Sequence, residues 1–201
     1  MDHAKHLYIW ELSALIALCA CLLTGLWAQG KQSAIAGSLV RLHVLAVSDE
    51  AEEQAVKLRV RDAVLQYLAP KLSDVKTAEQ AEAVLASSLD EIRAAAETAA
   101  EGRAVRVSLS DERYPTRDYE GFALPAGRYR SLRVVLGEGE GRNWWCVVFP
   151  PVCLAAAQRE AVRPVMRPED YALIAREEGW QLRFRIVELW GELLERVSCG
   201  E

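Results

Sequence analysis

The sequence predicts an α+β protein, with a mostly antiparallel sheet, helices packed on a face of it, and an apolar N-terminal helix in front. Three observations lead to this prediction. An uncharged apolar stretch lies near the N-terminus, two segments of helical periodicity follow a first β-rich segment, and the hydrophobic period then changes to two. Separate runs of helices and strands are typical of one sheet with helices on a face. The 201 residues suffice for one domain with a core.

The N-terminal segment has the length and composition of an export signal. No charged residue lies between Leu12 and Gly30. As a helix this stretch would be about 28 Å long, close to the roughly 30 Å apolar thickness of a bilayer. Ala28 is an acceptable cleavage residue, but Leu26 two positions earlier is a poor partner for it, so a cleaved signal and a retained anchor both stay open.

Export sets the expected domain organisation. Residues 1–30 form a signal peptide or membrane anchor, residues 31–38 a polar linker, and residues 39–201 a single extracytoplasmic signalling domain. The polar linker after the apolar stretch favours export over a buried core helix. The chain therefore contacts a membrane through its N-terminal segment.

Helix starts are marked by two capping boxes. Asp49 with Glu52, and Thr77 with Gln80, have the spacing in which a side chain caps the first turn. Gly102 is placed to end the second, alanine-rich helix. The expected elements in chain order are a strand 39–46, helices 51–68 and 81–99, strands 105–110 and 130–136, a strand from Asn143, a strand 181–186 and a helix 187–197.

A glycine-rich segment, Gly137 to Gly141, connects two of these strands. It resembles a phosphate loop superficially, but it precedes a strand rather than a helix, and Glu138 and Glu140 would repel phosphate. We interpret it as a turn that joins strand 130–136 and the strand from Asn143 into a hairpin.

The segment Asn143 to Cys153 is the most specific in the chain, since it holds two tryptophans, two prolines and two cysteines. Neighbouring strand residues point to opposite faces, so Trp144 and Trp145 must be covered separately. One tryptophan can join the core under the helices. The other is covered by the C-terminal helix, the Pro150–Pro151 corner or a partner protein, for which exposed tryptophan is a typical anchor.

The cysteines outside the apolar segment can form disulfides in an exported protein. The proline corner could bring Cys146 and Cys153 within bridging distance, and we expect this bridge. Two reduced thiols, or a bridge that uses Cys199, remain as alternatives.

No catalytic apparatus is evident, and we do not expect an enzyme. The apolar neighbours of Cys146 do not favour a thiolate, although His43 could in principle serve as its base. With one histidine outside the leader, no metal site is expected. Nothing in the sequence brings two acids together for hydrolysis; the acids considered are Asp49, Asp62, Asp111 and Asp118. No cofactor and no small-molecule substrate is expected. A net charge of −5 with interleaved signs argues against a nucleic-acid partner.

Several segments resemble the stage II sporulation protein R family. They are Arg41–Asp49, Lys57–Ala63, Tyr114–Thr116, Leu124–Tyr129, Leu132–Gly137 and Asn143–Cys153, and the ending 181–197 is similar as well. The resemblance implies a protein exported by the forespore into the space between its two membranes. It further implies an activator of a membrane-embedded aspartic protease, which then cleaves the precursor of sigma factor E in the mother cell.

The expected contact surface for that protease is the tryptophan strand with its proline corner and nearby basic residues. We assign to it Trp144, Trp145, Pro150, Pro151, Arg41, His43 and Arg133. The basic residues could equally be solvated or sheet-pairing side chains. Two other functions stay open: an exported cell-wall hydrolase with an unrecognised carboxylate pair, and a tethered module that binds the protease without activating it.

Overall fold

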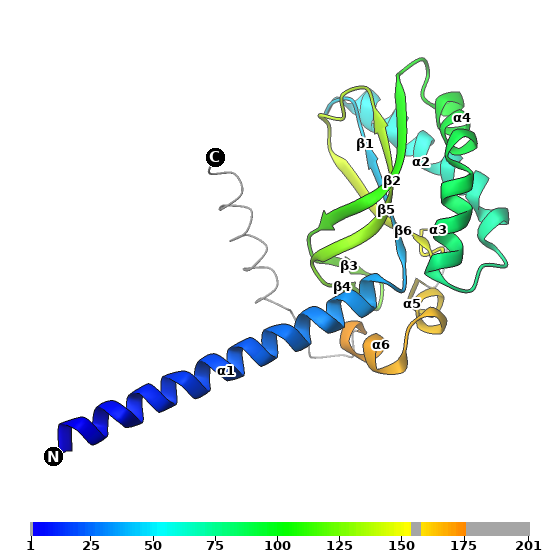
Figure 1. Cartoon of the computed structure of the whole chain (residues 1–201). Coiled ribbons are helices and arrows are strands. Elements are labelled where there is room, and N and C mark those ends of the chain that lie inside the picture. Colours follow the sequence, from blue (N-terminus) through cyan, green and yellow to red (C-terminus); the bar gives the residue numbers. More distant parts are fainter. Residues whose placement is uncertain (1, 154–157, 176–201) are drawn as a thin grey trace.

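The computed structural model describes residues 2–153 and 158–175. Its described part has a four-stranded sheet, a small two-stranded sheet and a long N-terminal helix that projects away from them (Figure 1). The expected strand 181–186, the expected helix 187–197 and Cys199 lie outside the described residues. The elements are α1 (Asp2–Ala36), β1 (Val40–Leu45), α2 (Ala51–Leu72), α3 (Ala78–Ser87), α4 (Leu89–Ala99), β2 (Val105–Tyr114), β3 (Arg117–Tyr119), β4 (Phe122–Leu124), β5 (Gly127–Leu136), β6 (Asn143–Phe149), α5 (Gln158–Val162), η1 (Arg163–Val165) and α6 (Pro168–Ile174).

The main sheet has the strand order β2-β5-β1-β6. Strand β1 runs parallel to β5 and antiparallel to β6, and β2 runs antiparallel to β5. The predicted α+β class with a mostly antiparallel sheet is confirmed.

The predicted hairpin between β5 and β6 is wrong, because β1 lies between these two strands. All six residues of β1 are buried, as suits a strand that is paired on both edges. The glycine segment therefore crosses the end of β1 instead of turning tightly. Gly141 donates its N–H to the Ala46 carbonyl at 3.0 Å, and a Cβ at Gly141 would collide with the Ser48 carbonyl.

Helices α2, α3 and α4 cover one face of the sheet (Figure 1). Alternate residues of the strands face these helices, as the period of two predicts. The core they form takes Leu42 and Val44 from β1, Leu132 and Val134 from β5, and Val56, Val60, Val64, Leu85 and Ile92 from the helices.

The two helix starts differ in their outcome. The Thr77 cap is confirmed, since its hydroxyl accepts the Gln80 N–H at 3.3 Å. The prediction that Asp49 caps the first helix is wrong. Helix α2 begins at Ala51 without a side-chain cap, and the Asp49 carboxylate instead accepts the Arg142 N–H at 2.7 Å, from the loop before β6.

The expected long alanine-rich helix is two helices, α3 and α4, which meet at Ser88. The Ser88 backbone leaves helical geometry, and its N–H bonds to the Leu85 carbonyl at 3.1 Å. This break lets α3 contact β1 while α4 packs beside α2. Helix α2 also continues past its expected end, through Pro70 in its last turn, to Leu72.

The other face of the sheet is covered in part by the end of α1, β3, β4, α5 and α6 (Figure 1). These elements form a second core around Ile35, Leu39, Phe122, Tyr129 and Val147. Residues 31–36, assigned from the sequence to a linker, are helical and continuous with α1. The division into an N-terminal segment and one extracytoplasmic domain stays a prediction.

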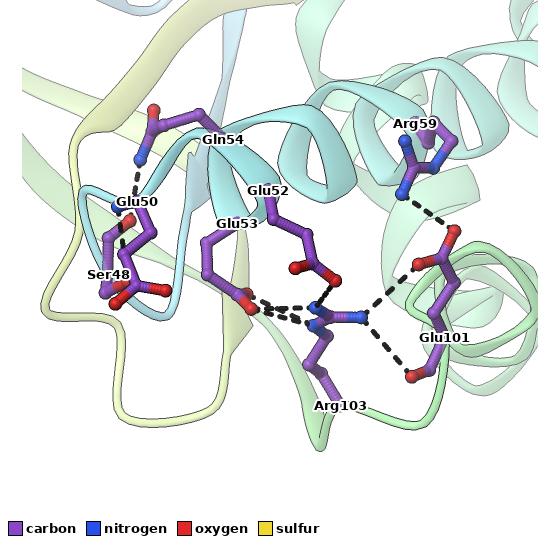
Figure 2. Close-up of polar contacts among 8 residues, drawn as sticks. All are labelled: Ser48, Glu50, Glu52, Glu53, Gln54, Arg59, Glu101 and Arg103. Atoms are coloured by element: carbon purple, nitrogen blue, oxygen red, sulfur yellow. Dashed lines mark hydrogen bonds and ion pairs between the residues drawn. The ribbon is translucent and has the colours of Figure 1, made fainter.

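A cluster of ion pairs fastens the start of α2 to the loop between α4 and β2 (Figure 2). Arg103 donates to the Glu53 carboxylate at 2.7 Å and to that of Glu52 at 3.3 Å. Glu101 receives Arg103 on one side and Arg59 on the other. The hydrogen bond from Arg103 lowers the pKa of Glu53. The residues of this cluster bridge neighbouring elements, so we interpret it as structural.

Candidate functional site

The face of the main sheet opposite helices α2–α4 carries a row of polar side chains. Strand register aligns Ser108 of β2 with Arg133 of β5, Arg133 with His43 of β1, and His43 with Trp145 of β6. The next row holds Ser110, Ser131, Arg41 and Val147 in the same strand order. We call Arg41, His43, Glu112, Ser131, Arg133 and Trp145 the polar sheet face.

His43 is the centre of this face and is buried. Its Nδ1 lies 3.2 Å from the Glu112 carboxylate and its Nε2 lies 2.9 Å from the Asn143 side-chain oxygen. Its ring stacks on Trp145 with 3.8 Å between centroids. Cys146 belongs to the core on the opposite face, so His43 is not placed to serve as a base for this thiol.

Glu112 joins His43 to Arg133, whose Nε lies 3.3 Å from its carboxylate. Burial alone would raise the pKa of Glu112. Hydrogen bonds from His43 and Ser131, with the charges of His43 and Arg133, outweigh burial and lower that pKa. Glu112 is therefore a carboxylate held ionised between the His43 ring and the Arg133 guanidinium.

Arg41 lies one row below and has 0% of its surface exposed. Its guanidinium carbon is 4.0 Å from the ring centroid of Tyr114 and 5.0 Å from that of Tyr129, and its Nη2 donates to the Tyr119 hydroxyl at 3.0 Å. Cation–π contacts stabilise a cation in such a setting. In the described chain its Nε and Nη1 have no hydrogen-bond partner. Arg41 thus ties β3 to the sheet and does not itself reach the surface.

The two tryptophans of β6 lie on opposite faces, as predicted. Trp144 packs against the helix-covered core, with the Arg61 guanidinium 4.4 Å from its ring. Trp145 packs against His43 and also against Tyr114, whose ring centroid is 4.6 Å away. Arg117 lies 5.8 Å above the Trp145 ring. Each tryptophan is covered in part by the domain itself and keeps part of its surface exposed.

Strand β6 ends in the proline corner, where Cys146 and Cys153 form a disulfide with Cα atoms 6.1 Å apart. This agrees with the expected bridge. The Phe149–Pro150 peptide bond is cis. Pro150 is buried and Pro151 is exposed. Strand β6 is the last in the sheet order, so among the described strands its outer edge is unpaired.

The loop before β6 is held in place by Lys57 of α2. Its buried ammonium donates to the Arg142 carbonyl at 2.9 Å and to the Gln54 side chain at 2.6 Å. Burial lowers the pKa of Lys57. The position of Asn143, and with it the Nε2 contact of His43, depends on this support.

The four acids considered for hydrolysis, Asp118 included, all have interaction partners. Asp49 accepts the Arg142 N–H, Asp62 pairs with Arg61 at 2.7 Å, and Asp111 lies 3.6 Å from Arg130. Over residues 2–153 and 158–175, no group of three or more histidine, cysteine or acidic side chains could hold a metal ion.

Sequence reasoning missed Glu112, Asn143 and Tyr114 at this site. The strand expected at 105–110 in fact continues to Tyr114, as β2. Had the alternation been extended by four residues, Glu112 and Tyr114 would have fallen on the same face as Ser108 and Ser110. Asn143 gave no such signal, because its role depends on β1 lying beside β6.

Comparison with known proteins places the chain among its relatives. The family model of stage II sporulation protein R matches residues 36–159, which include the whole four-stranded sheet. Stage II sporulation protein R of Bacillus subtilis (strain 168) is 38% identical over 129 residues, 62% of this chain and 58% of that protein. The chain thus spans a little over half the length of this relative. No solved structure matches the chain. On the evidence of this match, the chain belongs to the stage II sporulation protein R family.

Proposed function

We propose that the protein is an exported sporulation signal that activates a membrane-embedded aspartic protease, which then processes the precursor of sigma factor E in the mother cell. The observation that carries this proposal is the family match over the whole sheet. The apolar helix α1 is compatible with export or anchoring. The place of action would be the space between the two forespore membranes, and the chain itself would be a signal rather than an enzyme.

The contact surface for the protease would be the outer edge of β6. Trp144 with Arg61 lies on one side of this edge, and Trp145 with Arg117 on the other. An aromatic ring on each side of an unpaired strand edge offers both backbone hydrogen bonds and apolar anchors to an extended segment of a partner.

The predicted contact residues would divide into two roles. Arg133, Pro151 and the two tryptophans are at least partly exposed and could touch the partner. The others, Arg41, His43 and Pro150, are buried and would hold the contact residues in place. Activation then requires that the edge bind the active state of the protease more tightly than the inactive one.

The proposal is tested by co-expressing the full chain, the protease and its sigma precursor in a host without the sporulation programme, and by following precursor cleavage on immunoblots. Trp145→Phe and Pro151→Glu should reduce cleavage, because each alters the β6 edge while keeping most of the fold. Arg93→Glu, on the exposed side of α4, is the matched control, and precursor cleavage by the protease should be normal with this variant.

Circular dichroism of each variant separates a lost contact from a lost fold. Full cleavage with folded Trp145→Phe and Pro151→Glu would exclude the β6 edge as the contact surface. No cleavage with the wild-type chain would overturn the activator function itself. Release of fragments from purified peptidoglycan would support a cell-wall hydrolase instead.

A further inference from the structure

Helix α1 connects a lipid-like segment to the folded domain without a break. It runs from Asp2 to Ala36, and its stretch from Tyr8 is long and apolar enough to cross a membrane. The described part of the protein covers none of the most apolar portion of that stretch. Large apolar side chains project from all sides of it, namely Leu12, Leu15, Ile16, Leu18, Leu22, Leu23 and Leu26. A helix that is apolar on all sides and not covered by protein suits a lipid environment better than water.

Aromatic residues lie at both ends of this apolar stretch. Trp10 is 74% exposed at one end and Trp27 is 50% exposed at the other. Trp27 follows Trp10 by seventeen positions, so the helix rises about 26 Å from one to the other. Tryptophan is enriched at the two water interfaces of a transmembrane helix. The spacing therefore places both tryptophans at interfaces at once.

Within the turns that follow Trp27 the same helix enters the domain. Ala28, Gln32 and Ile35 are buried and lie on one side of α1, at helical spacing. Gln32 packs so closely on Gly127 that any Cβ there would collide with it, and its amide approaches the Arg128 carbonyl at 3.5 Å. The helix is thus locked against β5.

An ion-pair network holds the same turn to α6. Lys31 donates to Asp170 at 2.9 Å, and Arg167 donates to the other oxygen of this carboxylate at 2.7 Å. The Asp170 side chain is 2% exposed. Removing one partner of a buried ion pair is far more costly than losing an exposed one. This contact therefore sets the position of α6 along α1.

From these contacts we infer that α1 is a retained transmembrane anchor, and that it seats the domain directly on the extracytoplasmic membrane surface, with α6 against the lipid headgroups. Lys31 follows Trp27 by four residues, a rise of about 6 Å. Helix α6 is bound at that level, so no length of flexible chain separates it from the interface. Figure 1 shows α6 beside the last third of α1, on the side of the domain nearest to the apolar stretch. This inference does not depend on the protease as partner.

Retention is tested on the full chain exported in a bacterial host. An anchor predicts that the mature protein keeps residues 1–28, stays in the membrane pellet after alkaline carbonate extraction, and shows its intact N-terminus by mass spectrometry. A soluble protein that begins at Gln29 would overturn the anchor.

Seating is tested by photo-cross-linking in vesicles of mixed zwitterionic and anionic phospholipid. The cross-linking amino acid p-benzoylphenylalanine replaces Glu169 or Ala172, both exposed on α6, and as a control it replaces Glu91 on α4. Lipid adducts are expected from α6 and not from Glu91. Adducts at neither α6 position would overturn the seating even if the anchor is retained.

A flexible insertion separates rigid seating from simple tethering. A short Gly-Ser segment between Gly30 and Lys31 keeps the membrane span, and it keeps the contacts that Lys31, Gln32 and Ile35 make with the domain. It breaks the rigid helical connection between the span and the domain. The variant should remain in the membrane pellet and lose its α6 lipid adducts. Unchanged adducts would mean that the domain binds lipid by itself and that the continuity of α1 does not seat it.

Discussion

The rings of His43 and Trp145 stack on neighbouring strands, with 3.8 Å between centroids and 15° between planes. This contact joins the central strand to the edge strand that we propose as the docking surface. His43 is buried and is in turn held by Glu112 and Asn143, so the partly exposed Trp145 rests on a ring whose two nitrogens both have polar partners. The orientation of Trp145 should therefore depend on the buried His43.

A double-mutant cycle measures this dependence. His43→Ala and Trp145→Ala should each destabilise the domain, and the pair should be non-additive by about 0.5–1.5 kcal/mol, the usual range for aromatic pairs. Urea unfolding followed by circular dichroism gives the four free energies. Strict additivity would show that the stacking contributes nothing to stability.

Arg41 should be replaced most easily by an apolar side chain of similar length. Arg41→Ala should lower the unfolding free energy by several kcal/mol, because it empties a space lined by three tyrosines. Arg41→Met should cost less, since it fills that space and removes a buried cation whose Nε and Nη1 have no partner in the described chain.

Tyr119→Phe is the matched control for Arg41, because it removes only the hydroxyl that accepts from the guanidinium. A loss of about 1.5–3 kcal/mol is expected for one charge-assisted hydrogen bond. Equal losses for Arg41→Met and Arg41→Ala would contradict the packing argument. Denaturation midpoints in urea decide between the two results.

Acid should unfold the protein partly through Asp170. Burial would raise the pKa of this carboxyl, but hydrogen bonds and charges from Lys31 and Arg167 lower it overall. A carboxyl whose folded pKa is depressed contributes full stability above its unfolded pKa, about 3.9, and loses it as pH falls through the folded pKa. Stability should therefore decline with acidification below about pH 4.5.

Asp170→Asn should flatten this acid limb, because it removes the titrating group while keeping its shape. The variant should be less stable than the wild type at neutral pH and should approach it at low pH. Urea titrations at a series of pH values provide the comparison. An acid limb that is as steep as that of the wild type would assign the acid sensitivity to other groups, such as Glu112, whose pKa is also lowered.

The disulfide should stabilise the corner after β6. Its two cysteines are seven residues apart, and loop-closure entropy for so short a ring amounts to about 2.5 kcal/mol. The double variant Cys146→Ser/Cys153→Ser should lose about this amount in the absence of reductant. Dithiothreitol should destabilise the wild type similarly and leave the double variant unchanged; an effect on that variant would point to another disulfide.

Local features of the site could be predicted because they depend on neighbours in the chain. The opposite faces of Trp144 and Trp145 follow from strand geometry, and the Thr77 cap from a spacing of three residues. The burial of Arg41 could not be predicted, because the three tyrosines around it come from β2, β3 and β5. A basic residue in a strand is expected to be exposed to solvent until its neighbours across the sheet are known.

The sequence by itself determined the apolar N-terminal helix, the α+β class and the strand that carries the tryptophans, since periodicity and composition act over a few residues. Only the tertiary structure decided that β1 lies between β5 and β6, because strand order depends on which strand is buried on both edges. That order brings His43 beside Trp145 and leaves β6 as an edge. Tertiary contacts likewise turn residues 31–36 from an expected linker into the part of α1 that packs against the domain.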